Sequence, residues 1–72
     1  MTLDRVKRGC LCRIISMPSE QVRDQCIRLG ICEGETVNCC EIVPAGPVVI
    51  RKKRQEIAIG RALAKKIAVE EI

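Results

Sequence analysis

The 72-residue sequence contains no phenylalanine, tyrosine, tryptophan or histidine. Without aromatic rings, aliphatic side chains and cysteine must fill the core, and the chain lacks the stacking platform that binders of single-stranded nucleic acid use. Without histidine, Ser–His and Cys–His catalytic pairs and every zinc site that needs imidazole are excluded. We therefore expect no catalytic residue and no enzyme, since no remaining pair of side chains supplies a nucleophile with a base beside it.

Long apolar runs are missing as well. No run approaches the roughly eighteen apolar residues of a membrane span, and Met1–Arg5 lacks the apolar region of a signal peptide. We expect a cytoplasmic protein whose link to a membrane runs through another protein. The length favours one domain over residues 1–72, and 47% hydrophobic residues exclude disorder.

The charge balance is modestly basic, with 13 Lys and Arg against 9 Asp and Glu, a net charge of +4. Such a balance suits an acidic protein surface or anionic lipid, and it is also common on solvated surfaces. A free-standing nucleic-acid-binding barrel rests on this charge alone. Because aromatic residues are missing, we expect no nucleic-acid partner.

A helix and the corner after it organise the chain. Val22, Cys26 and Leu29 are spaced as one apolar stripe, which predicts a helix over residues 20–29. Gly30 follows where a helix commonly ends in a left-handed residue. A second glycine four residues later precedes a strand-like run, so we expect this corner to turn the chain from helix to sheet.

The remaining segments have the alternation or the β-branched composition of short strands. The expected strands are Gly9–Met17, Glu35–Val43, Val48–Lys53, Glu56–Ile59 and Ile67–Val69. Pro44–Pro47 is a turn by composition, and Arg61–Lys66 is expected as a single helical or 3₁₀ turn. Five short strands with one α-helix between the first two predict a mostly β fold, a small closed or half-closed barrel, because closure protects the edges of so short a sheet.

Alternation also predicts which side chains face the core. Cys12, Val37 and Cys39 lie at inward positions, whereas Cys40 and Ile42 are expected on the outer face. By the same alternation Lys52 falls on the inward face with Val48 and Ile50. Either the strand leaves the barrel at Lys52, or the Lys52 side chain extends its amine outward to solvent. Thr2–Arg8 is expected as a short, charged and capped turn that ends at Gly9.

An ordered series of motifs runs along the chain: Gly9-x-x-Cys12-x-Ile14, Leu29-Gly30-Ile31-x-x-Gly34-x-x-Val37, Gly46-Pro47-Val48, Ile57-Ala58-Ile59 and Ala64-x-x-Ile67-x-Val69. This series resembles the FeoA family of small cytosolic accessory proteins in bacterial ferrous-iron transport. The resemblance covers almost the whole chain and implies an SH3-like barrel without chemistry of its own. It also implies a partner, the cytoplasmic GTPase region of the transporter FeoB. A similar domain is fused to iron-dependent repressors, where it serves as an interaction module.

The sequence departs from the family pattern in three ways. Gln25-Cys26 stands where an Arg-Leu pair is usual, and Arg54 replaces a common glycine. Cysteine occupies several positions that aliphatic residues or threonine usually fill. Arg23 and Arg28 lie on the same helix and are candidates to replace the missing family arginine.

Six cysteines raise the alternative of a thiolate metal carrier or sensor for iron or zinc. The cysteines form no C-x-x-C pair, and adjacent strand residues such as Cys39 and Cys40 point to opposite faces. We therefore expect the cysteines to be packing residues and expect no resident cofactor. If a metal site exists, its candidate ligands are Cys10, Cys32 and Cys40.

The run Arg51-Lys52-Lys53-Arg54 is the most concentrated charge in the chain. It is either a solvated hairpin end or a patch that meets an acidic partner, phosphates or lipid. Together with the two helix arginines, these residues form the expected partner-binding set: Arg23, Arg28, Arg51, Lys52, Lys53 and Arg54.

Overall fold

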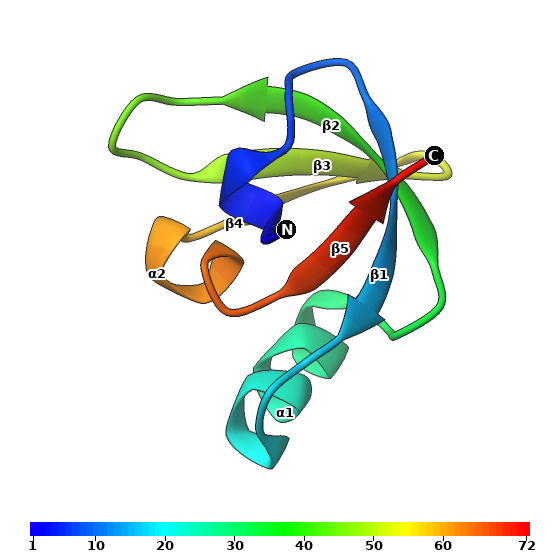
Figure 1. The fold of residues 1–72 in the computed structure, drawn as a ribbon, viewed down its shortest axis with the longest axis vertical. Helices are drawn as coiled ribbons and strands as arrows, with labels where there is room; N and C mark the ends of the chain where they lie inside the picture. The colour runs from blue at the N-terminus through cyan, green and yellow to red at the C-terminus, as the bar shows by residue number, and fades with distance from the viewer.

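The computed structural model describes residues 1–72 as a small antiparallel barrel with one α-helix of several turns (Figure 1). The elements are η1 (Leu3–Arg5), β1 (Leu11–Ser16), α1 (Glu20–Leu29), β2 (Thr36–Ile42), β3 (Val48–Lys52), β4 (Gln55–Ile59), α2 (Arg61–Ala64) and β5 (Ala68–Glu71). The strands are hydrogen-bonded in the order β4-β3-β2-β1-β5, and every pair is antiparallel. The predicted mostly β fold, with one helix inserted between the first two strands, is confirmed.

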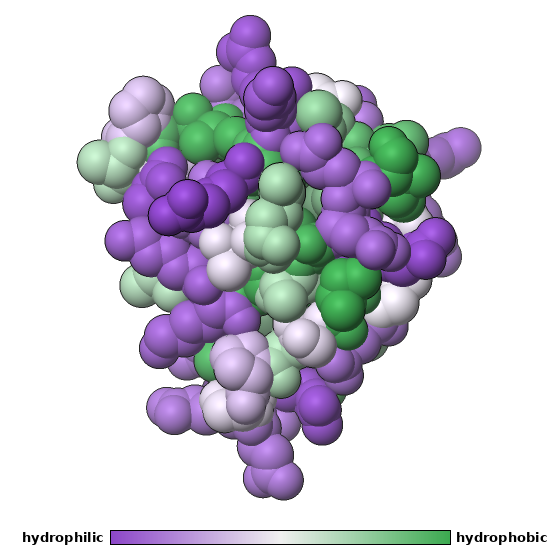
Figure 2. Space-filling model, viewed as in Figure 1, coloured by the Kyte–Doolittle hydropathy of each residue, from purple (hydrophilic) through white to green (hydrophobic).

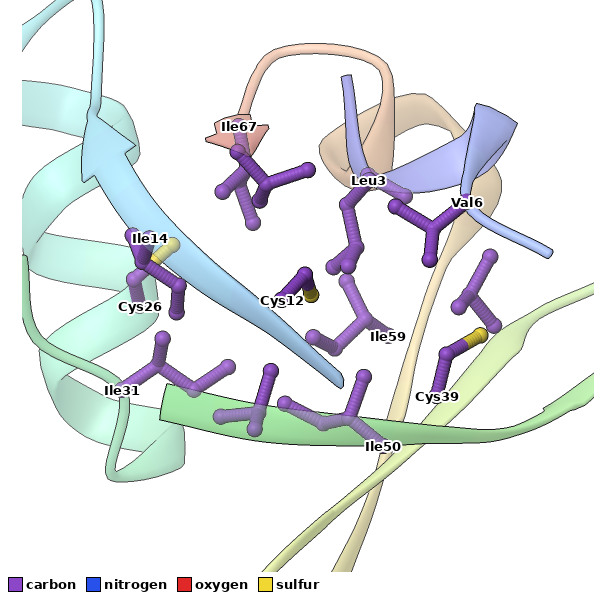
Figure 3. Close-up of a cluster of buried hydrophobic side chains, with 14 of the residues drawn as sticks. Leu3, Val6, Cys12, Ile14, Cys26, Ile31, Cys39, Ile50, Ile59 and Ile67 are labelled. Carbon is purple, nitrogen blue, oxygen red and sulfur yellow. The ribbon is translucent and has the colours of Figure 1, made fainter. Parts of the chain in front are cut away.

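The core lies inside the curved sheet and contains no buried polar or charged residue. It is built from aliphatic side chains and from three cysteines, Cys12, Cys26 and Cys39, which are fully buried (Figure 3). Cysteine therefore fills core positions as a small apolar residue, as the sequence predicted. Leu3 and Val6 are also buried, although the sequence indicated only a charged turn in that segment.

The N-terminal segment lies along β5 and covers part of that edge of the sheet. The Val69 amide donates to the Met1 carbonyl at 2.8 Å, and the Leu3 amide donates to the Ile67 carbonyl at 3.0 Å. The expected cap of this turn, by Thr2 or Asp4, is absent. The Thr2 hydroxyl donates instead to the carboxylate of Asp4, and no side chain caps η1.

Two β-bulges interrupt the alternation along the strands. In β1 the pairing with β5 shifts between Ile14 and Ser16, and in β2 the pairing with β3 shifts between Cys39 and Glu41. Each bulge inserts one extra residue and resets which side chains face inward. Ile42 consequently packs against the core, so its predicted position on the outer face is wrong.

The first strand begins two residues later than predicted because Gly9 forms a turn. Gly9 has φ +88°, and the Cys10 amide donates to the Lys7 carbonyl at 3.2 Å. The Gly9 amide donates to the Cys39 carbonyl, and the Cys39 amide donates to the Cys10 carbonyl. Gly9 and Cys10 thus both lie opposite Cys39. This is a G1 β-bulge, in which the first of the two residues is a glycine with positive φ.

Other boundaries differ from the prediction by one or two residues. The third strand ends before Lys53, because that residue has φ +57° and turns the chain toward β4. The turn between β3 and β4 therefore lies at Lys53-Arg54. The second strand is shorter by one residue at each end, the short helix α2 ends at Ala64, and the last strand runs over Ala68–Glu71.

Candidate partner-binding surface

The corner after α1 is held by a regular helix ending. The hydroxyl of Ser19 caps the first turn of the helix by accepting from the Val22 amide at 3.2 Å. At the other end Gly30 has φ +91°, and its amide donates to the Ile27 carbonyl. The Ile31 amide donates to the Cys26 carbonyl at 2.8 Å, which completes a Schellman motif. The predicted helix over residues 20–29 and its glycine ending are confirmed.

The apolar stripe of the helix differs from the prediction at its last position. Val22 and Cys26 are buried, but Leu29 is 36% exposed. Ile31, the residue after the glycine, is fully buried beside the stripe, because the motif folds the chain back over the helix. Ile27 is 54% exposed, so the last turn of α1 presents two apolar side chains to solvent.

Lys52 joins the β3–β4 hairpin to this corner. Its ammonium group donates to the Gly30 carbonyl at 2.6 Å and forms an ion pair with Glu35. A cation at the last carbonyls of a helix is favourable because the helix dipole places partial negative charge there. The sequence predicted that Lys52 begins inward and must redirect its amine, and the structure identifies the groups that the amine meets.

Glu35 completes the network at the corner. One of its oxygens accepts from the Cys32 amide at 2.7 Å, and the other faces Lys52. The hydrogen bond from Lys52, with a smaller contribution from the Cys32 amide, lowers the pKa of this carboxyl below its ordinary value of 4.5. The sequence analysis did not identify Glu35, because nothing in a linear pattern indicates that residue 35 faces residue 52.

The six predicted basic residues divide into two groups. Three form ion pairs within the chain: Arg23 with Glu33 at 3.3 Å, Arg51 with Glu56 at 2.6 Å, and Lys52 with Glu35. The hydrogen bond that Arg51 donates to Glu56 raises the pKa of Arg51, which stays charged. Arg28, Lys53 and Arg54 are exposed and form no ion pair within the chain, so their charges are free to meet a partner.

Two of the free cations, Lys53 and Arg54, directly follow Lys52 in the chain. Because the Lys52 ammonium group reaches the Gly30 carbonyl, the end of β3 lies within one lysine side-chain length of the corner after α1. We call this region the corner surface and define it by its five exposed residues: Ile27, Arg28, Leu29, Lys53 and Arg54. Exposed apolar side chains together with positive charge are the composition expected of a surface that binds an acidic protein.

The candidate metal ligands are not brought together. Cys10 is half-buried and packs against the core, whereas Cys32 is exposed at the corner. Cys40 lies in the β2 bulge, where its sulfur is 3.7 Å from the Asn38 carbonyl. No group of three or more cysteine or carboxylate side chains in the structure is arranged to hold a metal ion.

None of the helices has the length and apolar character needed to cross a bilayer. No cavity or pocket opens on the surface of the molecule.

One family model matches almost the whole chain, and solved structures share its fold. A family model described as FeoA domain matches residues 1–71. A crystal structure of an iron uptake regulatory protein, FeoA, has a TM-score of 0.90 with 23% identity and covers 100% of this chain and 97% of that chain. An NMR structure of a FeoA-like protein from Clostridium acetobutylicum has a TM-score of 0.87 with 23% identity, covering 100% of this chain and 86% of the other. The predicted SH3-like fold is confirmed.

The same fold occurs as part of a longer protein. The manganese regulator SloR matches with a TM-score of 0.89 and 19% identity, and the alignment covers 100% of this chain and 34% of that chain. No curated protein matches the chain by sequence.

Proposed function

Because the chain belongs to the FeoA domain family, we propose that it is an accessory protein of bacterial ferrous-iron transport that binds the cytoplasmic GTPase region of the transporter FeoB. The proposal places the protein in the cytoplasm and gives it no catalytic role. Hydrolysis of GTP and movement of iron belong to the transporter, and ferrous iron is the cargo. Family membership carries the proposal, and the corner surface supplies its geometry.

The corner surface supports this function because its shape is fixed by internal contacts. The helix ending is closed by backbone hydrogen bonds, and Lys52 ties the hairpin to it. A surface held in place loses little conformational freedom on binding, so more of its contact energy contributes to affinity. Arg28, Lys53 and Arg54 supply charge for steering toward an acidic partner, and Ile27 and Leu29 supply apolar contact.

A calorimetric titration against the purified cytoplasmic domain of a FeoB from the same genome tests the proposal. We expect saturable binding, weakened at least ~10-fold in the double variant Lys53→Glu/Arg54→Glu, because reversing two interface charges introduces repulsion. The matched control is Lys65→Glu/Lys66→Glu, which changes the net charge equally on another part of the surface. Absence of binding at high micromolar concentration, or equal weakening by both variants, would contradict the proposal.

A substitution on the helix tests the apolar part of the same surface. Because Ile27 is 54% exposed, Ile27→Ser should leave the fold intact and weaken binding to the transporter domain. The same substitution at a core residue such as Ile14 would not test the interface, because Ile14 is fully buried and its loss would destabilise the fold. If Ile27→Ser binds as tightly as the wild type, the helix lies outside the interface.

The thiolate carrier or sensor remains the alternative in another functional class. Native mass spectrometry of reduced protein, purified with iron or zinc present, decides between the two. We expect the metal-free mass. A stoichiometric bound ion would replace the accessory role as the leading interpretation, with Cys10, Cys32 and Cys40 as the first ligands to substitute.

A further inference from the structure

Four basic side chains lie at the end of the molecule that η1 and α2 form together. Arg5 belongs to η1, Arg61 begins α2, and Lys65 and Lys66 follow it. η1 contacts α2, and the Leu3 amide bonds to the Ile67 carbonyl, so these segments lie together. Figure 2 shows hydrophilic atoms gathered over η1 and α2, on the left of the view. We call Arg5, Arg61, Lys65 and Lys66 the α2 face.

The charge of the α2 face is not neutralised within the chain. None of its four side chains forms an ion pair. Arg61 donates to the carbonyls of Gly46 and Val43 at 3.1 and 2.8 Å, but carbonyls carry no formal charge. Residues 60–69 contain three cations and no carboxylate, and Asp4 is the one carboxylate of η1.

We propose that the α2 face binds the phosphate headgroups of an anionic lipid bilayer. A bilayer presents a plane of fixed negative charge, and each Lys or Arg near such a plane strengthens binding by roughly five-fold. The two Arg61 hydrogen bonds hold α2 against the β2–β3 loop, so the cations project from a fixed support. This direct contact differs from the purely indirect membrane link that the sequence suggested.

Lipid fits this face better than nucleic acid does. Nucleic-acid-binding surfaces on small barrels combine cations with aromatic rings that stack on bases, and this chain has no aromatic residue. The α2 face and the turn between β3 and β4 lie on opposite sides of the view in Figure 1. The protein can therefore contact a membrane and a membrane-embedded transporter at the same time. This simultaneous contact rests on the proposed function, whereas the lipid contact by itself does not.

Vesicle co-sedimentation tests the proposal without any transporter. Vesicles of phosphatidylcholine alone are compared with vesicles containing about 30% phosphatidylglycerol, at about 0.05 M and about 0.5 M salt. We expect binding to the anionic vesicles at low salt only. Lys65→Glu/Lys66→Glu should lose at least ~25-fold in binding, whereas Lys53→Glu/Arg54→Glu, with the same change in net charge, should lose less than ~3-fold.

Each other outcome overturns the assignment. Absence of binding by the wild type, equal binding to neutral vesicles, or equal losses in the two charge-reversal variants would each contradict a lipid-binding α2 face. Retention on DNA or RNA at the same salt, lost in Lys65→Ala/Lys66→Ala, would assign the face to nucleic acid instead. Matching circular dichroism and melting curves establish that each variant is folded. Whether or not the protein binds the anionic vesicles, the calorimetric test of the transporter contact is unaffected.

Discussion

Lys52 shows how one side chain can join two elements that are distant in the sequence. Its stem starts at the end of β3, and its ammonium group reaches the Gly30 carbonyl and Glu35. The Lys52 side chain is 22% exposed, so these contacts are partly shielded from water and stronger than those of a surface pair. The alternation of β3 predicted that this lysine is unusual, but it did not predict which groups the lysine meets.

We expect Lys52→Met to lower the free energy of unfolding by about 1–2 kcal/mol, because the Gly30 carbonyl and Glu35 both lose their charged partner. Urea denaturation followed by circular dichroism measures the change. Lys53→Met, one residue along and exposed, is the control and should change stability by less than about 0.5 kcal/mol. Equal effects of the two variants would show that the network adds nothing to stability.

Glu35 should make stability depend on pH. Its pKa in the folded protein lies below the ordinary value of 4.5, mainly because Lys52 donates to it. The folded state therefore binds this proton less readily than the unfolded state does, so the contribution is fully present above pH 4.5. The contribution is lost as the pH falls through the lowered pKa.

Urea denaturation at a series of pH values from neutral to acidic measures this dependence for the wild type and for Glu35→Gln. We expect the variant to be less stable near neutral pH and to lose less stability on acidification. Glu56→Gln is a control at another, more exposed ion pair. Parallel curves for wild type and Glu35→Gln would rule out the lowered pKa as a source of stability.

At the scale of elements, the helix ending is the best test of why α1 stops where it does. Gly30 has φ +91°, a conformation that costs a residue with a Cβ about 1–2 kcal/mol. Gly30→Ala should destabilise the protein by that amount in urea or thermal denaturation. Gly60→Ala is the matched control, since Gly60 has φ −55° and no atom lies within 4 Å of an added Cβ. A neutral Gly30→Ala would mean that the corner adapts without strain.

The helix and the strand count could be predicted because local signals agree there. Ser19, the apolar spacing and Gly30 indicate the same helix, and turn residues separate the strands. The bulges at Ile15 and Cys40 could not be predicted, because a bulge depends on how the partner strand aligns. That is why Ile42 was assigned to the wrong face. The late start of β1 has a separate cause, the turn at Gly9, where φ is +88°.

The candidate site could be predicted only as a set of charges. Arg28, Lys53 and Arg54 are exposed without ion pairs, whereas Arg51 and Arg23 are engaged by carboxylates on another segment. A run of charged residues in a sequence does not show which of them form ion pairs, because folding and strand pairing bring the carboxylate partners close. The buried Leu3 and Val6 were missed for a similar reason, because the core that they join is built from segments distant in the sequence.

At the scale of the whole molecule, three buried cysteines report on whether the barrel opens as a unit. Cys12 comes from β1, Cys26 from α1 and Cys39 from β2, and all three are fully buried. Burial raises the pKa of Cys12 to about 11, with smaller contributions from Cys39 and Cys10, and burial also raises the pKa of Cys26 and of Cys39. In the folded state these thiols are therefore both inaccessible and protonated, so alkylation requires that the barrel open.

Alkylation by iodoacetamide near pH 8, followed by peptide mass spectrometry, should modify the exposed Cys32 first. Cys12, Cys26 and Cys39 should react much more slowly and at one common rate, because the barrel has one core and we expect it to unfold as a single cooperative unit. The common rate should rise with urea in step with the unfolded fraction, and Lys52→Met should raise it at every urea concentration. Labelling in high urea, where all six cysteines are equally reactive, is the reference. Earlier reaction of Cys26 than of Cys12 and Cys39 would show that α1 detaches first, and the rigid corner assumed for partner binding would then be a mobile one.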